Sequence, residues 1–534
     1  MLLNRRNFIN LSGIFIASLI LSACRDTKMT SRIELDGNLN LKLPLIPPRQ
    51  LSSNASYTIG LYNISNDEIQ KNYIDPLIYS TLIDMDHVTG ELFSDIAFKI
   101  EELNSTNYLF SIRDDIYFHS NQNGYAEKMK INDIINNFQS RKMNKEPFFS
   151  KVVKDFQVLG NKILVVLNQP FPYFFEYISN PSIAGISKIS PSSKMQQKTG
   201  SGPFVPILVN DNQYVFGRNT LYHQKHLPLL KNIILKNYSD VNILRKDFGN
   251  NEIDLIASNE FIELLSSIPL NFDELKFPSK ELIFLGLSMD SLKNGKEVKF
   301  IKAFQNPKVR KALSMSLNRQ KLSEEFNGFM SGPLPPSFPL DSLNMNELRL
   351  NEFMRFDPVT AKRLLEESGY KGLEFRIDLP NSLFFNKLGS ELISQISEVG
   401  FKPRLIYRDA PKLQKSFELG DFECILSSYN FNLSPDDGLL INKSLGINDQ
   451  FSYWGFSSPL YDLEVERSFL ESLPTKRGPL AKNAQLILLE QSPAMLPLFC
   501  SSSNILASKN IYGFQYEKFE SNFKMYSKYW SKIS

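Results

Sequence analysis

The sequence predicts an α/β fold with mixed sheets, and three observations support this prediction. The chain has 534 residues, which is long enough for two or three domains with proper cores. Strand and helix patterns alternate from residue 357 to residue 427, and such alternation requires crossover connections and a largely parallel sheet. Short strand patterns with turn signals between them occupy the earlier part of the chain, and these favour hairpins.

The first half of the chain carries strand patterns and one clear helix. Tyr57–Leu61 alternates as a strand does, and so does Asn107–Arg113. Two aspartates then predict a turn into Ile116–His119, so we expect a hairpin there. Ile131–Phe138 has apolar residues at helical spacing. Gly160 and the asparagine after it predict a second hairpin turn, because both residue types accept positive φ at low cost.

The second half carries the helix–strand alternation. Asp357 is a good N-cap, and Pro358 fits the first turn of the helix that follows. A later helix with an apolar stripe ends at Gly400. The next strand contains Pro403, which predicts that it lies at a sheet edge or starts late. Ala494–Phe499 predicts a last strand that returns toward the first part of the fold.

The N-terminus has the pattern of a cleaved export signal. Arg5 and Arg6 precede an uncharged, mostly apolar run, Leu11–Leu21, which as a helix covers only about 16 Å of a ~30 Å hydrocarbon core. Cys24 follows a leucine and two small residues, which resembles the lipobox of bacterial lipoproteins. We therefore expect residues 1–23 to be a lipoprotein signal peptide and Cys24 to be acylated. The arginine pair fits either a general basic start or a twin-arginine export motif.

Residues 24–53 are predicted to be a tether between lipid and fold. They are polar and carry Pro44, Pro47 and Pro48. After Cys24 no apolar run is long enough to span a membrane.

The charge balance gives no electrostatic reason to expect binding to nucleic acid. The chain has 60 basic and 57 acidic side chains. Arg5 and Arg6 leave with the signal peptide, so the mature protein has a formal charge of about +1. We therefore expect no nucleic-acid partner and no polybasic membrane patch.

Motifs spread over nearly all of the mature chain occur in the order typical of one family. They are Leu77–Leu82, Thr89–Leu92, Ile112–His119, Ile131–Ile134, Thr199–Phe204, Arg218–Tyr222, Gly249–Leu255, Ile283–Ser288 and Pro307–Arg319. Each match alone is weak, but the ordered set is a strong signal. By these motifs the chain resembles the extracellular solute-binding proteins of family 5, which are the peptide, oligopeptide and nickel receptors of ATP-binding-cassette (ABC) importers.

The resemblance implies a two-lobed periplasmic-binding-protein fold of the large three-subdomain type with a two-strand hinge. Lobe one is expected over residues 54–280, with a subdomain at about 70–182, and is completed by residues 500–534. Lobe two is expected over residues 281–499, which includes the α/β stretch.

The resemblance also implies a function. The protein is expected to be a monomer outside the cytoplasm that binds a peptide or another small solute between closing lobes and delivers it to an ABC permease and its ATPase subunits. It would be anchored to the membrane by its lipid. Two rival interpretations stay open: a sensor or adhesin of the same fold that is not coupled to import, and an extracytoplasmic hydrolase.

The resemblance places the ligand contacts at two points of the chain. The expected ligand-binding residues are Tyr62, Asn63, Ser428, Tyr429, Asn430, Phe431 and Asn432. In peptide-binding relatives an aspartate at the position of Asn432 neutralises the ligand's α-ammonium, whose burial otherwise costs several kcal/mol. Asn432 supplies no charge, so a peptide with a free amino group is not the expected ligand unless Asp436 or Asp437 replaces that aspartate.

No pattern in the sequence indicates a catalytic or metal centre. Metal-ligand, phosphate-loop and nucleophile-elbow motifs are absent, so we expect no enzyme activity, no cofactor and no metal. His223 and His226 make half a metal site at best, and we interpret both as structural. Cys424 and Cys500 either form a disulfide or are separate buried thiols; the spacing alone does not decide.

Overall fold

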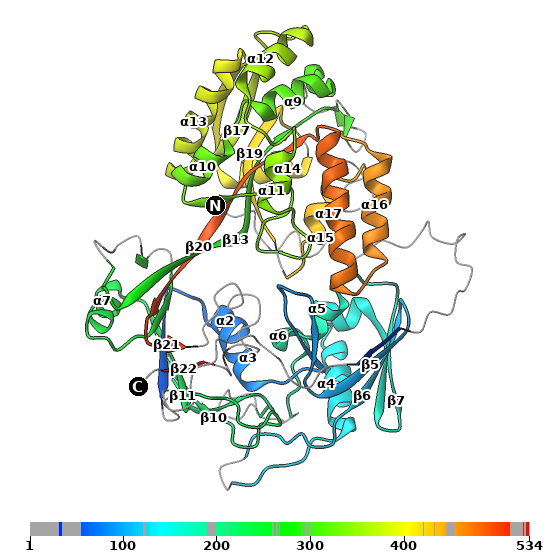
Figure 1. Ribbon diagram of the computed structural model, residues 1–534, viewed down its shortest axis with the longest axis vertical. Helices are drawn as coiled ribbons and strands as arrows, with labels where there is room; N and C mark the ends of the chain where they lie inside the picture. Colours follow the sequence, from blue (N-terminus) through cyan, green and yellow to red (C-terminus); the bar gives the residue numbers. More distant parts are fainter. Residues whose placement is uncertain are drawn as a thin grey trace. The chain divides into compact units, whose positions relative to one another are not determined.

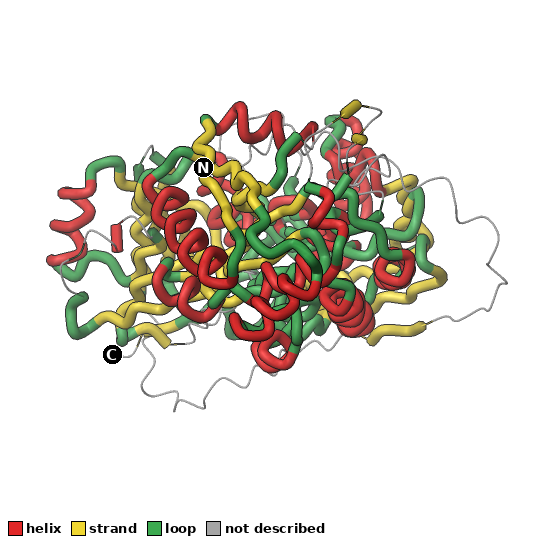
Figure 2. The backbone as a smooth tube through the Cα atoms, turned by 90° about the horizontal axis from the view of Figure 1, so that it is seen from above, coloured by secondary structure: helices red, strands yellow, loops and turns green. Residues whose placement is uncertain are grey.

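A computed structural model of the chain gives its fold (Figure 1). The described residues are 31–34, 55–120, 124–188, 199–210, 212–258, 261–262, 265, 268–290, 292–293, 296–297, 301–419, 421–431, 433–444, 454–512, 527 and 530–532. The expected signal peptide, Cys24 and most of the tether lie outside these residues. Helices and strands are interleaved along the described chain, and Figure 2 shows the backbone coloured by these elements.

The described chain divides into two compact units. Unit 1 contains Phe277–Glu471 and Thr475–Ser502, and unit 2 contains the described parts of Asp26–Lys276, Ser472–Pro474 and Ser503–Ser534. Two strands, β13 (Phe272–Leu287) and β20 (Met495–Ser508), neighbour each other in the large sheet and pass from one unit into the other (Figure 1). The lobe boundaries expected from the resemblance stay a prediction.

The sheet of unit 1 has the order β18-β17-β19-β13-β20, with β16 on β20. The strands besides β13 and β20 are β16 (Gly328–Met330), β17 (Glu374–Pro380), β18 (Lys402–Arg408) and β19 (Cys424–Asn430). β17 runs parallel to both β18 and β19, as the alternating pattern predicted. β18, which contains Pro403, is an edge strand, which confirms the expectation from its proline.

Helices connect and cover these strands. They are α9 (Pro307–Met315), α10 (Arg319–Glu325), α11 (Met345–Leu350), α12 (Pro358–Glu367), α13 (Leu383–Val399), α14 (Ala410–Leu419), α15 (Asp436–Leu440), α16 (Pro459–Phe469) and α17 (Pro474–Glu490). The carboxylate of Asp357 accepts the Thr360 N–H at 3.0 Å and caps α12. Gly400 ends α13 with φ of 110°, a conformation that favours glycine. Both helix ends confirm the sequence prediction.

Unit 2 contains the remaining strands of the large sheet. Their order continues from β20 as β12-β2-β11-β10-β9. These are β2 (Ser56–Tyr62), β9 (Phe204–Val209), β10 (Gln213–Arg218), β11 (Asn232–Tyr238) and β12 (Leu255–Ala257), with helix α7 (Val241–Gly249). β2 is parallel to β11 and to β12, and the centre of β2 is fully buried. Tyr57–Leu61 is therefore a strand, as predicted.

A second, antiparallel sheet of unit 2 has the order β1-β5-β6-β8-β7. Its strands are β1 (Ser31–Glu34), β5 (Ala97–Asn104), β6 (Asn107–Ile112), β7 (Val153–Leu159) and β8 (Lys162–Leu167). Aromatic rings cover one face: Tyr108 of β6 stacks on Phe174 at 4.3 Å. Phe174 belongs to the short helix α5 (Phe174–Ile178), and α4 (Ile131–Met143) packs its apolar side into the same core. Gly160 turns β7 into β8 with φ of 65°, as predicted.

Shorter elements complete the described chain. They are α2 (Asn66–Ile69), a π-helical segment (Gln70–Ile74), α3 (Asp75–Ile78), β3 (Ile83–Met85), β4 (Leu92–Ser94), a second π-helical segment (Phe148–Val152), α6 (Pro181–Ala184), β14 (Leu292–Lys293), β15 (Lys296–Glu297), a 3-10 turn (Lys302–Gln305), β21 (Ile511–Tyr512) and β22 (Ser531–Lys532). Among the described helices none has both the length and the apolar character that a membrane span needs.

The expected hairpin between Asn107–Arg113 and Ile116–His119 is wrong. β6 pairs with β5 and β8 instead, and Ile116–His119 contributes only an isolated bridge from Tyr117 to Lys128. The two aspartates do turn the chain, but both sides of β6 are already occupied by other strands. Strand pairing between distant segments therefore overrides the local turn signal.

Two arginines of the Pro307–Arg319 motif are buried without a carboxylate partner among the described residues. The Arg319 guanidinium donates to the carbonyl oxygens of Pro497 at 2.7 Å and Ser314 at 2.9 Å. Arg310 donates to the carbonyls of Ser492 and Phe304. Burial lowers the pKa of Arg319 to about 9 and that of Arg310 to about 10. These contacts fix the chain on either side of the start of β20.

We predict that Arg319→Lys destabilises unit 1. A lysine is a single point donor and cannot satisfy carbonyls on several elements at once, so buried acceptors lose their partners. The free energy of unfolding should fall by about 2–4 kcal/mol in denaturant titrations. The matched control is Arg349→Lys on α11, where the side chain is exposed and the change should stay within about 0.5 kcal/mol. Equal stabilities of the two variants would contradict the structural role of Arg319.

Candidate functional site

The main candidate site lies at the C-terminal end of β19 in unit 1. Ser428, Tyr429 and Asn430 are the last residues of this strand, and Phe431 follows directly. The strand lies between β17 and β13, and Asn430 is paired in register with Glu281. The Phe431 N–H continues the pairing by donating to the Lys280 carbonyl at 2.9 Å. The structure thus brings these four predicted residues together.

The aromatic side chains of this segment are packed inside unit 1. Tyr429 is 8% exposed and Phe431 is 3% exposed. Their rings meet edge to face at 4.9 Å, and Phe431 meets Phe338 in the same manner at 5.7 Å. Ser428 is also buried, and its hydroxyl has no hydrogen-bond partner among the described residues. Asn430 is half-buried.

Tyr429 contacts Asp437, one of the two carboxylates that could replace the aspartate that relatives have at the position of Asn432. Its hydroxyl donates to Asp437 Oδ2 at 2.5 Å. Burial and, to a smaller extent, the neighbouring Asp436 charge raise the pKa of Asp437 to about 7, although the hydrogen bond from Tyr429 acts in the opposite direction. Asp437 therefore titrates near neutral pH, and its Oδ2 is occupied by the hydrogen bond from Tyr429.

Asp436 is the more accessible carboxylate at the start of α15. It is half-buried, and the Ser434 hydroxyl donates to its Oδ1 at 2.6 Å. Burial raises the pKa of Asp436, while the bond from Ser434 and the charge of Arg477 lower it. Arg477 is itself paired with Asp341 at 3.1 Å, and both side chains are buried. The site therefore combines one accessible acid with a buried ion pair.

Tyr62 and Asn63 lie at the end of β2 in unit 2. Tyr62 is half-buried, pairs in register with Tyr238 and packs against the apolar cluster around α7. Asn63 is exposed with φ of 55°, and its N–H donates to the Tyr238 carbonyl at 2.9 Å. These two predicted residues belong to another unit than Ser428–Phe431. Asn432 and Cys24 lie outside the described residues.

His223 is buried beside a carboxylate. The His223 ring Nε2 lies 3.1 Å from Asp95 Oδ1, and both side chains are almost completely buried. Asp95, which the sequence analysis did not single out, also accepts the Thr81 N–H at 2.7 Å. Within the described ranges no three His, Cys, Asp or Glu side chains are grouped to hold a metal ion. Cys424 and Cys500 are separate, buried free thiols, and burial raises the pKa of both.

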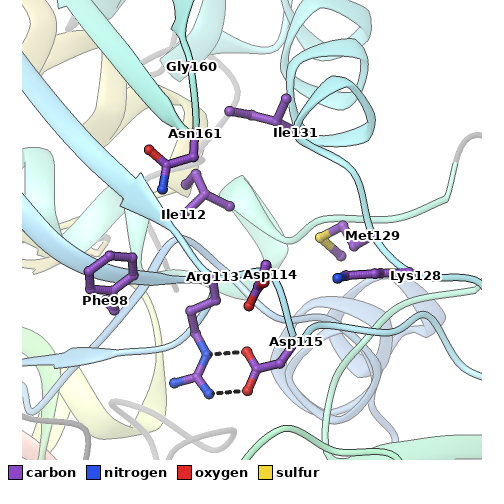
Figure 3. A pocket seen from close by; sticks show the side chains of 10 residues that line it. All are labelled: Phe98, Ile112, Arg113, Asp114, Asp115, Lys128, Met129, Ile131, Gly160 and Asn161. Carbon is purple, nitrogen blue, oxygen red and sulfur yellow. Dashed lines mark hydrogen bonds and ion pairs between the residues drawn. The ribbon is translucent and has the colours of Figure 1, made fainter.

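Unit 2 also has an open pocket of about 770 Å³ beside the five-stranded sheet (Figure 3). It is lined by Phe98, Ile112, Arg113, Asp114, Asp115, Lys128, Met129, Ile131, Gly160 and Asn161. Arg113 donates two hydrogen bonds to Asp115, at 2.8 and 2.6 Å. The sequence indicates a turn and a family motif at Ile112–His119 but gives no signal of a pocket there. The two basic and two acidic side chains balance, so the pocket has no clear preference for ligand charge.

The family model for bacterial extracellular solute-binding proteins, family 5 (middle part), matches residues 97–449. The match covers more than half of the chain and extends over parts of both units. The chain belongs to this family, whose members bind solutes outside the cytoplasm. The resemblance found in the sequence is confirmed.

Individual relatives are distant. The glutathione-binding protein GsiB of Salmonella typhi is 23% identical over 437 residues, which cover 76% of this chain and 80% of that protein. HbpA2 of Haemophilus parasuis has 18% identity and a TM-score of 0.75, over 90% of this chain and 100% of that one. DppA of Helicobacter pylori, solved with the peptide STSA, has 18% identity and a TM-score of 0.57, over 90% and 98% of the two chains. These likenesses confirm the predicted α/β fold of the periplasmic-binding-protein class.

We predict that Asp437 makes the stability of unit 1 depend on pH. Its folded pKa of about 7 lies above its usual value, so its neutral form is favoured in the fold. The stabilisation is complete below about pH 4 and is lost as pH rises through 7. Asp437→Asn has no carboxyl group to titrate at this position. As pH rises from 5 to 8, its free energy of unfolding relative to that of the unsubstituted protein should therefore increase by about 1–3 kcal/mol in denaturant titrations.

The control for this experiment is Glu398→Gln, an exposed carboxylate on α13 whose removal should leave the pH dependence unchanged. Parallel pH profiles for Asp437→Asn and the unsubstituted protein would show that Asp437 does not titrate in this range.

Proposed function

We propose that this protein is the substrate-binding component of an ABC importer. It acts as a monomer, holds a peptide or another small solute between two closing lobes, and delivers it to a membrane permease. The observation that carries the proposal is the family match over residues 97–449. Among solved proteins of similar fold, DppA of Helicobacter pylori is in complex with a peptide, and NikZ of Campylobacter jejuni is in complex with Ni(L-His).

The proposed mechanism is binding with closure and no chemistry. β13 and β20, which pass between the units, supply a two-strand hinge about which the lobes close. A ligand that contacts both lobes favours the closed state by its extra contacts there. Closure then presents one composite surface to the permease. A few polar anchors set specificity, while backbone groups and waters accept varied side chains.

We propose as ligand-binding residues Ser428, Tyr429 and Asn430 at the end of β19 with Phe431 and Asn432 after them in the chain, and Tyr62 at the end of β2 with Asn63 after it. Asp437 is hydrogen-bonded to Tyr429 at 2.5 Å, which leaves Asp436 as the carboxylate available to a ligand ammonium. Asn432 contributes an amide without charge. In this proposal Asp436 supplies the negative charge that pairs with a ligand's amino group.

Mass spectrometry of the solute that co-purifies with the mature protein tests the proposed function. We expect a small molecule that is released unchanged, and calorimetric titration should then measure its rebinding. Asp436→Asn should weaken a ligand with a free amino group by about tenfold or more and leave its N-acetylated form unaffected. Conversion of the solute during incubation would favour a hydrolase. Binding without any loss of uptake in a deletion strain would favour a sensor or adhesin.

We also propose that residues 1–23 are removed and that Cys24 carries the lipid that anchors the protein outside the cytoplasm. Cys24→Ser should move the protein from the membrane to the soluble fraction, because the acyl chains then have no attachment point. Cys500→Ser is the control: this thiol is buried in β20, and its loss should leave fractionation unchanged. Membrane retention of Cys24→Ser would contradict the anchor.

A further inference from the structure

A strand lies inside the segment that the sequence predicts to be a plain tether. β1 (Ser31–Glu34) pairs antiparallel with β5 at the edge of the five-stranded sheet. Four consecutive residues of each strand are in register, from Ser31 opposite Glu102 to Glu34 opposite Lys99. The chain is therefore tied to the sheet a few residues after Cys24.

The register is continuous over the four residues of β1. It places Ile33 opposite Ile100, which is fully buried in the aromatic core of the sheet. It also places Arg32 opposite Glu101, an acidic residue that already accepts Lys162 at 3.1 Å. β1 also covers the backbone groups that β5 would otherwise expose as an edge.

The pairing changes how far the fold can be from the lipid. About seven Cα–Cα steps lead from Cys24 to Ser31, and at about 3.4 Å each they span at most about 24 Å. Without β1 pairing, about 31 Cα–Cα steps would lead from Cys24 to Ala55, the residue before β2, and the limit would be about 105 Å. For a flexible chain the typical reach rises from about 15 Å to about 30 Å.

We propose that β1 is a docking strand that shortens the lipid tether and holds the five-stranded sheet of unit 2 close to the membrane surface. The partner of this edge is the lipid surface, at a distance that the chain between Cys24 and Ser31 limits to about 25 Å. β1 thereby determines which part of the protein faces the membrane. The membrane part of this inference rests on the proposed lipidation of Cys24, whereas the docking of β1 does not.

Disulfide trapping in native membranes of the full-length protein tests the docking. Arg32→Cys and Glu101→Cys occupy paired positions, whose Cα atoms in an antiparallel ladder are about 4.5–5.5 Å apart, within reach of a disulfide. The control pair is Arg32→Cys with Gln157→Cys. Gln157 lies in the same cross-strand row at the opposite edge, about 19 Å away. We expect the first pair to oxidise almost completely and the control pair to stay reduced.

Energy transfer tests the distance to the membrane. A donor on Gln157→Cys and an acceptor on the lipid headgroups report how near the sheet lies. Ile33→Pro removes a backbone donor from β1 and breaks the pairing, so transfer should fall by about twofold or more. Leu41→Pro is the matched control outside β1 and should leave transfer unchanged.

The outcomes separate this inference from the proposed function. Failure of the Arg32–Glu101 pair to oxidise, or equal oxidation of the control pair, would overturn the docking of β1 whether or not the protein is lipidated. Oxidation of the first pair in a protein that does not fractionate with membranes would refute the anchor, and with it the membrane-facing role, while β1 docking itself stands. Oxidation together with equal energy transfer in Ile33→Pro and Leu41→Pro would overturn the membrane-facing role alone.

Discussion

The structure depends on two strands that are shared by both units. β13 and β20 are the central elements of the large sheet, and the boundary between the units falls within each of them. In unit 1 the start of β20 is held by buried guanidinium groups, because Arg319 and Arg310 donate to carbonyls at Pro497 and Ser492. These guanidinium donors hold the carbonyl groups at the start of β20 in place within unit 1.

The candidate site follows from the position of β19 beside β13. Packed aromatic rings lie at the end of β19, and a carboxylate pair begins α15. Asp437 is bound to Tyr429 and titrates near neutral pH, whereas Asp436 stays more accessible. The two adjacent aspartates thus have different roles, because they differ in burial and in hydrogen-bond partners. The sequence alone left these two residues as equivalent alternatives.

Local rules predicted most of the regular structure. The cap at Asp357, the helix end at Gly400 and the edge strand with Pro403 all follow from backbone chemistry within a few residues. The pairing of β6 was missed because its partners come from distant segments, and no local signal records them. The same holds for Asp95 against His223 and for the carbonyl partners of Arg319. The site residues came from the family resemblance, and their role in binding stays a prediction.

The central claim is that two units close around a solute and leave it unchanged. Spin labels on Val359→Cys in α12 and Ile243→Cys in α7 place one exposed probe on each unit, while the native thiols Cys424 and Cys500 are buried. The account predicts that the distribution of distances between the labels shortens and narrows when the co-purifying solute is added. An unchanged distribution at a saturating concentration of that solute would contradict it.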